Sequence, residues 1–155
     1  MEASPPPLSK IAKVFGLAGL LPQLIAVLFL LDGSGMRWIA TAGGFGYAAL
    51  IFSFLGGIWW AIAMLNRNAP DWIYAVAIAP SLIALATFLP WTWGWNWPGP
   101  SLLILAICLF ASPMVDRAIG RVLPLAEGWL ALRWQLSSGL GLLTAILAVS
   151  AFSAP

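Results

Sequence analysis

Residues 38–65 read WIATAGGFGYAALIFSFLGGIWWAIAML, a run of 28 residues without a formal charge. A hydrocarbon core about 30 Å thick needs about 20 apolar residues per crossing helix, so this run can span a membrane even when tilted. Four further apolar runs accompany it. We predict five transmembrane helices, at about 11–31, 38–65, 72–89, 101–115 and 134–152, with the charged residues in the gaps or near the ends of the runs.

The composition supports a membrane protein without a soluble domain. The chain has 155 residues, of which 62% are hydrophobic and 8% charged, whereas soluble domains carry about 25% charged residues. A water-soluble fold is therefore excluded. We expect residues 1–10, which contain three consecutive prolines, to be a flexible tail, and residues 11–155 to form one all-α domain, an integral membrane bundle of five helices.

The first span contains Pro22 followed by Gln23. Proline in the middle of a helix removes a backbone donor and bends the helix. An unpartnered amide in hydrocarbon costs several kcal/mol, roughly 2–7. We therefore predict a bend near Pro22, and we expect Gln23 to face a neighbouring helix.

Small residues recur every four positions in two of the spans. The second span carries Ala49, Ser53, Gly57 and Ala61, and the fifth span carries Ser137, Gly141 and Ala145. Such stripes allow two helix backbones to approach closely. We predict that these two helices pack together through their stripes.

The segment from Asp116 to Arg133 mixes polar and small residues into an apolar background. This pattern is typical of an amphipathic segment at the membrane interface. We expect an interfacial helix, or a helix with a break, before the last span. Its residues Arg117, Arg121 and Arg133 are candidates for binding acidic lipid headgroups or a partner's acidic loop, although they also serve as simple topology determinants.

The basic residues predict an orientation. With five crossings, six of the seven fall on one side, namely Lys10, Lys13, Arg67, Arg117, Arg121 and Arg133, and only Arg37 falls on the other. Basic loops stay in the cytoplasm. We expect a multi-pass protein of the bacterial inner membrane, or of an organellar inner membrane, with its N-terminus cytoplasmic and its C-terminus outside. Dispersed basic residues of this kind explain topology and do not indicate a nucleic-acid partner.

Catalytic and metal-binding patterns are missing from the sequence. The chain has no histidine, one cysteine and five dispersed carboxylates, so it offers no spacing for a metal or a haem, and we expect no cofactor. A serine nucleophile would lack a nearby base. Apart from Lys13 near the start of the first run, the apolar runs hold no Asp, Glu, Lys or Arg, which disfavours an active transporter. We expect a protein that is not an enzyme.

The most biased segment follows the third span, where Trp91, Trp93, Trp95 and Trp97 alternate with other residues. Four indoles could form a platform for a flat or amphipathic ligand such as a quinone, a porphyrin or a lipid. The competing interpretation, which we favour, is that the loop anchors the protein at the outer interface.

Two stretches resemble a known family. They are GYAALIFSFLGGI at 46–58 with Trp60-Ala61, and Asp116-Arg117 with Leu123-Pro124, Trp129 and Leu132-Arg133. Both are similar to an uncharacterised multi-pass membrane family, the domain of unknown function 3429, which includes the animal transmembrane protein 69. The resemblance implies a multi-pass membrane fold and brings no reaction, substrate or cofactor.

These observations favour an accessory, assembly or interaction subunit of a membrane complex. Its expected partners are the lipid bilayer and other membrane protein subunits. The alternative is a binder or facilitator of a hydrophobic small molecule that uses the Trp91 to Trp97 loop.

Overall fold

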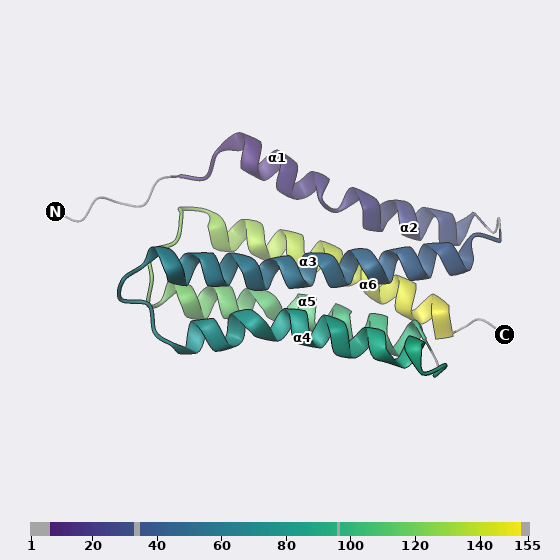
Figure 1. The fold of residues 1–155 in the computed structure, drawn as a ribbon. Helices are drawn as coiled ribbons and strands as arrows, with labels where there is room; N and C mark the ends of the chain where they lie inside the picture. Colours follow the sequence, from purple (N-terminus) through teal and green to yellow (C-terminus); the bar gives the residue numbers. More distant parts are fainter. Residues whose placement is uncertain (1–6, 33–34, 96, 153–155) are drawn as a thin grey trace.

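The computed structural model is a bundle of helices, and it describes residues 7–32, 35–95 and 97–152. Five helical stretches within these ranges are long and apolar enough to cross a membrane, as predicted. The first stretch is divided into two helices (Figure 1). The helices are α1 (Lys10–Ala18), α2 (Leu21–Leu31), α3 (Arg37–Leu65), α4 (Trp72–Thr92), α5 (Gly99–Gly120) and α6 (Trp129–Phe152). The predicted all-α class with five spans is confirmed.

The break in the first span lies at Gly19 and Leu20, just before Pro22. Pro22 stands in the first turn of α2, where its missing N–H has no helical partner to lose. The Gly19 carbonyl at the break accepts a hydrogen bond from the Tyr47 hydroxyl of α3. The span is therefore divided into two helices close to Pro22, where the sequence predicted only a bend, and α3 supplies a polar partner at the break.

Gln23 of α2 is fully buried against α6, and it faces a neighbouring helix as the sequence predicted. Its Nε2 donates to Thr144 Oγ1 at 2.9 Å. Thr144 in turn donates to the Leu140 carbonyl at 2.7 Å, within its own helix. Gln23 Oε1 has no hydrogen-bond partner among the described residues.

Helix α3 contacts four other helices, namely α2, α4, α5 and α6, and one of its faces stays exposed. Its closest approach is to α4, because Gly56 lies against the backbone of Ala77, where a Cβ would overlap the Ala77 carbonyl oxygen. Helix α5 packs most extensively on α6. By contrast α1 has no buried residue, and it rests on α6 at the edge of the bundle.

The connection between the last two helices is shorter than expected. Instead of an amphipathic interfacial helix from Asp116 to Arg133, α5 continues through Asp116 to Gly120, and only residues 121–128 connect it to α6. The helix continues because Asp116 and Ile119 are buried against neighbouring helices, so Asp116 has no need to reach the headgroups. Helix α4 likewise extends beyond Leu89 to Thr92.

Figure 1 shows the two ends of the bundle. The start of α1 and the connections α3–α4 and α5–α6 lie at one end, and the end of α6 and the connections α2–α3 and α4–α5 lie at the other. The six basic residues grouped by the sequence therefore belong to one end, which we call the basic end, and Arg37 belongs to the opposite end. Most of the expected flexible tail lies outside the described residues. At its described part, Leu8 N–H donates to the Glu127 carbonyl at 3.3 Å.

Candidate functional site

A buried ion pair near the basic end joins α5 to α6. Arg133 Nε lies 2.8 Å from Asp116 Oδ2, and both side chains are almost completely buried, at 6% and 1% exposure. The sequence reading that the spans hold no charged group is therefore wrong at these two positions. Asp116 and Arg133 are charged groups inside the bundle, so a lack of such groups no longer speaks against ion or proton transport.

The second oxygen of Asp116 is held by two tryptophans. Oδ1 accepts hydrogen bonds from Trp59 Nε1 of α3 at 3.0 Å and from Trp129 Nε1 of α6 at 3.4 Å. A buried carboxylate is tolerated only when it is paired and hydrogen-bonded. Asp116 meets both conditions, with donors from two different helices.

The hydroxyl of Ser112 links the ion pair to a second serine. Pro113 has no N–H, so the Leu109 carbonyl loses its helical donor, and the Ser112 hydroxyl donates to that carbonyl at 2.8 Å instead. The Ser112 oxygen then has lone pairs left to accept from Arg133 Nη2 at 3.3 Å and from Ser137 at 3.0 Å. We call the six residues the Asp–Arg cluster: Trp59, Ser112, Asp116, Trp129, Arg133 and Ser137.

Regular spacing places these side chains on facing sides of two helices. Ser112 and Asp116 are four residues apart in α5, and Trp129, Arg133 and Ser137 follow one another at four-residue intervals in α6. Residues four apart lie on the same face of a helix. This spacing is the sequence signal for the cluster, but a charge near the end of an apolar run also fits the boundary of an interfacial segment, which is the interpretation that the structure corrects.

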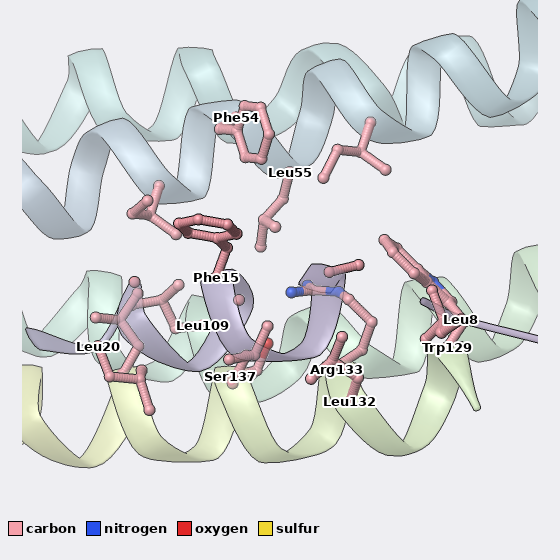
Figure 2. A pocket seen from close by; sticks show the side chains of 17 residues that line it. Leu8, Phe15, Leu20, Phe54, Leu55, Leu109, Trp129, Leu132, Arg133 and Ser137 are labelled. Carbon is pink, nitrogen blue, oxygen red and sulfur yellow. The ribbon is translucent and has the colours of Figure 1, made fainter. Parts of the chain in front are cut away.

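A cavity of about 280 Å³ lies beside the cluster, under α1. Its walls come from α1, α3, α5 and α6 and are apolar except for groups of Trp129, Arg133 and Ser137. Figure 2 shows the guanidinium group of Arg133 among the lining side chains, between Phe15 and Trp129. We call this space the α1 cavity.

The four tryptophans proposed as a platform do not share one arrangement. The Trp97 ring packs edge-on against Trp38 at 5.5 Å and Phe45 at 4.9 Å, between ring centroids. Trp93 and Trp95 lie against each other at 5.2 Å and are largely exposed. Trp91 contacts Phe88 and Trp97. Trp97 therefore faces the bundle, whereas Trp93 and Trp95 face away from it.

Helices α3 and α6 contact each other as predicted, but Gly57 and Gly141 of the two small-residue stripes do not meet. A Cβ at Gly57 would meet nothing within 4 Å, and a Cβ at Gly141 would meet the ring of Phe110 of α5, at 3.0 Å. In α3 the close approach uses the neighbouring Gly56 and is directed to α4. The four-residue spacing does mark helix faces made of small residues. It carries no information about which helix packs against each face.

The three arginines proposed for lipid headgroups separate into two groups. Arg117 and Arg121 are exposed at the basic end. Arg133 is buried and paired with Asp116, so it does not reach the headgroups. No group of three or more metal-ligating side chains occurs in the described ranges.

Comparison with known families gives one match. The model of a family described as "Protein of unknown function (DUF3429)" matches residues 8–149. The chain belongs to the DUF3429 family. The region shared with this family contains all residues of the Asp–Arg cluster and of the α1 cavity. No curated protein and no solved structure matches the chain.

Proposed function

We propose that this DUF3429 protein is a non-catalytic accessory or interaction subunit of a membrane complex, and that the outer face of α3 receives a transmembrane helix of another protein. The observation that carries the proposal is the open stripe on α3. A Cβ at Gly43, Gly46 or Gly57 would meet nothing within 4 Å. Ser53 and Ala61 lie on the same side, so the stripe continues over several turns of the helix.

The chemistry of this face limits the partner. From Trp38 to Leu65, α3 carries no charge, and small residues favour a close crossing by another helix backbone. The expected partner is therefore an uncharged transmembrane helix with small residues at the crossing point. Helix α4 already occupies the Gly56 side of α3, so the stripe around Gly57 is a separate surface.

The hydrogen bonds of the Asp–Arg cluster support a non-catalytic role. The hydroxyls of Ser112 and Ser137 are the nucleophile candidates at the site, and a carboxylate would have to accept a proton from one of them. Asp116 instead accepts from Arg133, Trp59 and Trp129. Ser112 donates to the Leu109 carbonyl. The arrangement is that of a structural network.

The orientation follows from the charges at the two ends. We place the basic end in the cytoplasm, or in the matrix of an organelle, since basic loops are retained there. The C-terminus then lies on the outer side of the inner membrane. A reporter that is active only in the cytoplasm, fused after Pro155, should give no signal; strong signal would reverse the orientation.

The docking proposal is tested by crosslinking in native membranes. A photoreactive amino acid at Ser53 should give one crosslinked protein of defined mass, and the same group at Leu82, a lipid-facing position of α4, should not. Gly57→Leu should abolish the Ser53 crosslink without lowering the unfolding temperature of the purified protein, since its side chain enters open space.

Each other outcome counts against the proposal. A crosslink between two copies of this chain would make α3 a homodimer interface. Crosslinks to lipid alone, or equal crosslinks from Ser53 and Leu82, would show that the α3 stripe has no protein partner.

A further inference from the structure

We propose that the α1 cavity binds an amphiphile with a single apolar chain and an anionic head, and that Arg133 receives the head. The anion is a carboxylate, as in a fatty acid, or a phosphate monoester. This binding site is separate from the stripe on α3 and goes beyond the docking role.

The first support is the unused capacity of Arg133. A guanidinium group has five N–H donors. Nε donates to Asp116 and Nη2 donates to Ser112, and Nη1 has no hydrogen bond to any described residue. The side chain is more than nine-tenths buried. Nη1 is not completely buried and belongs to a side chain that lines the cavity, so an anionic acceptor there would gain a charge-assisted hydrogen bond.

The second support is the way Asp116 is held. Its contact with Arg133 uses Nε alone, so the pair is not the bidentate one in which both carboxylate oxygens bind the guanidinium. Asp116 Oδ1 is satisfied by the two indoles. The guanidinium group of Arg133 is therefore held along one edge, and its remaining N–H groups are available to a second oxyanion.

The third support is the shape and lining of the cavity. Apart from the cluster residues its walls are aliphatic side chains, glycines, Ala12 and two phenylalanines. Phe15 of α1 and Phe54 of α3 both line the cavity and are largely exposed, so its mouth opens between these helices toward the surrounding lipid (Figure 2). A chain can enter from the bilayer while its head reaches Arg133.

The volume favours one chain over two. At about 280 Å³ the cavity is at the lower limit of small-molecule sites, which are roughly 300–1,000 Å³. A two-chain phospholipid cannot place both chains there. A neutral head could also accept a hydrogen bond from Arg133, but it would gain less, since it lacks the attraction between opposite charges that an anionic head adds in a poorly solvated site.

The test uses the full-length protein in a non-ionic detergent with palmitate, hexadecyl phosphate and hexadecanol as probes. Palmitate or hexadecyl phosphate should raise the unfolding temperature, and hexadecanol should bind more weakly by about tenfold or more. Which of the two anions binds more tightly distinguishes a fatty acid from a phosphate monoester. A brominated fatty acid should also quench tryptophan fluorescence, because Trp129 lines the cavity.

Two neighbouring residues of α1 supply a matched pair of variants. Ala12 lines the cavity, and Ile11 is exposed and does not line it. Ala12→Phe should fill the cavity and abolish the palmitate effect, whereas Ile11→Phe should leave it intact. Neither residue takes part in the hydrogen bonds of the ion pair, so we expect both variants to fold. The double variant Asp116→Asn with Arg133→Gln keeps a polar cluster without charge, and it should lose the preference for palmitate over hexadecanol.

Three results would overturn the proposal. Equal stabilisation by hexadecanol and the two anions would show that Arg133 does not select charge. Retention of the palmitate effect in Ala12→Phe would place binding elsewhere. Absence of any shift or quenching with all probes would show that the α1 cavity takes no such ligand.

Discussion

Tryptophans gather at both ends of the bundle, but they have different roles there. At the basic end, Trp59 and Trp129 direct their indole N–H groups to one oxygen of Asp116. At the opposite end, Trp93 and Trp95 contact each other and are exposed, and Trp97 packs on Trp38 and Phe45. The segment richest in tryptophan is thus not the place where polar groups converge.

The difference comes from how many helices contribute. The Asp–Arg cluster takes side chains from α3, α5 and α6, which pack closely enough to exclude solvent and lipid from Asp116. The segment from Trp91 to Trp97 runs from the last turns of α4 to the start of α5, so its members are close mainly because they are close in sequence. A site needs groups from separate elements directed to one point, and tryptophan content alone does not report that.

The largest effect should come from Arg133→Met. This change leaves Asp116 buried without its counter-charge, and loss of one partner of a buried pair costs about 3–5 kcal/mol. Thermal unfolding in detergent should show a large drop for Arg133→Met and almost none for Arg121→Met, an exposed arginine at the same end.

A second variant separates charge from packing at this pair. Asp116→Leu combined with Arg133→Met removes both charges, and it should recover much of the loss because apolar replacements of buried pairs are often neutral. If Arg133→Met lowered the unfolding temperature no more than Arg121→Met, the buried ion pair would not stabilise the basic end. The two ends would then not differ in the way described above.

The next effect concerns the tryptophan-rich end itself. Trp97→Ala should lower stability by about 2–3 kcal/mol, since a half-buried ring that packs on two others leaves a partial cavity, whereas Trp93→Ala should cost less than about 0.5 kcal/mol. Chemical denaturation of the two variants in the same detergent measures both. Equal losses of stability would mean that the segment acts as one packed unit. The distinction between its inward and outward tryptophans would then be wrong.

Much of the fold was readable from hydropathy and from single residues. The five spans follow from runs of about 20 apolar residues, an irregularity near Pro22 follows from the proline, although only a bend was expected there, and the inward position of Gln23 follows from the cost of an unpaired amide. Each of these properties depends on one segment and on the hydrocarbon around it. None depends on which helix packs against that segment.

The cluster was not readable in the same way. Asp116 and Arg133 are separated by a short connection, and they were assigned to the interface because a charge is usually found at the end of a span. Their pairing depends on α5 continuing to Gly120 and on the rotation of α5 and α6 about their axes. The stripes show the same limit, because Gly57 and Gly141 are on small faces whose partners only packing decides.

The smallest expected effect tests whether an indole at the basic end matters for its N–H and not only for its size. Trp59→Phe keeps most of the ring packing but removes the donor to Asp116 Oδ1 at 3.0 Å. A hydrogen bond to a charged group is worth roughly 1.5–3 kcal/mol, and Trp129 still donates to the same oxygen at 3.4 Å. We therefore expect Trp59→Phe to lower stability by about 1.5 kcal/mol in thermal unfolding, and Trp129→Phe to lower it by less.

Trp95→Phe at the opposite end removes an exposed indole and should leave the unfolding temperature unchanged. If Trp59→Phe and Trp95→Phe behaved alike, the N–H group of Trp59 would add nothing to stability, and Trp59 and Trp95 would differ in position only, since Arg133 and Trp129 would then be enough to hold the carboxylate.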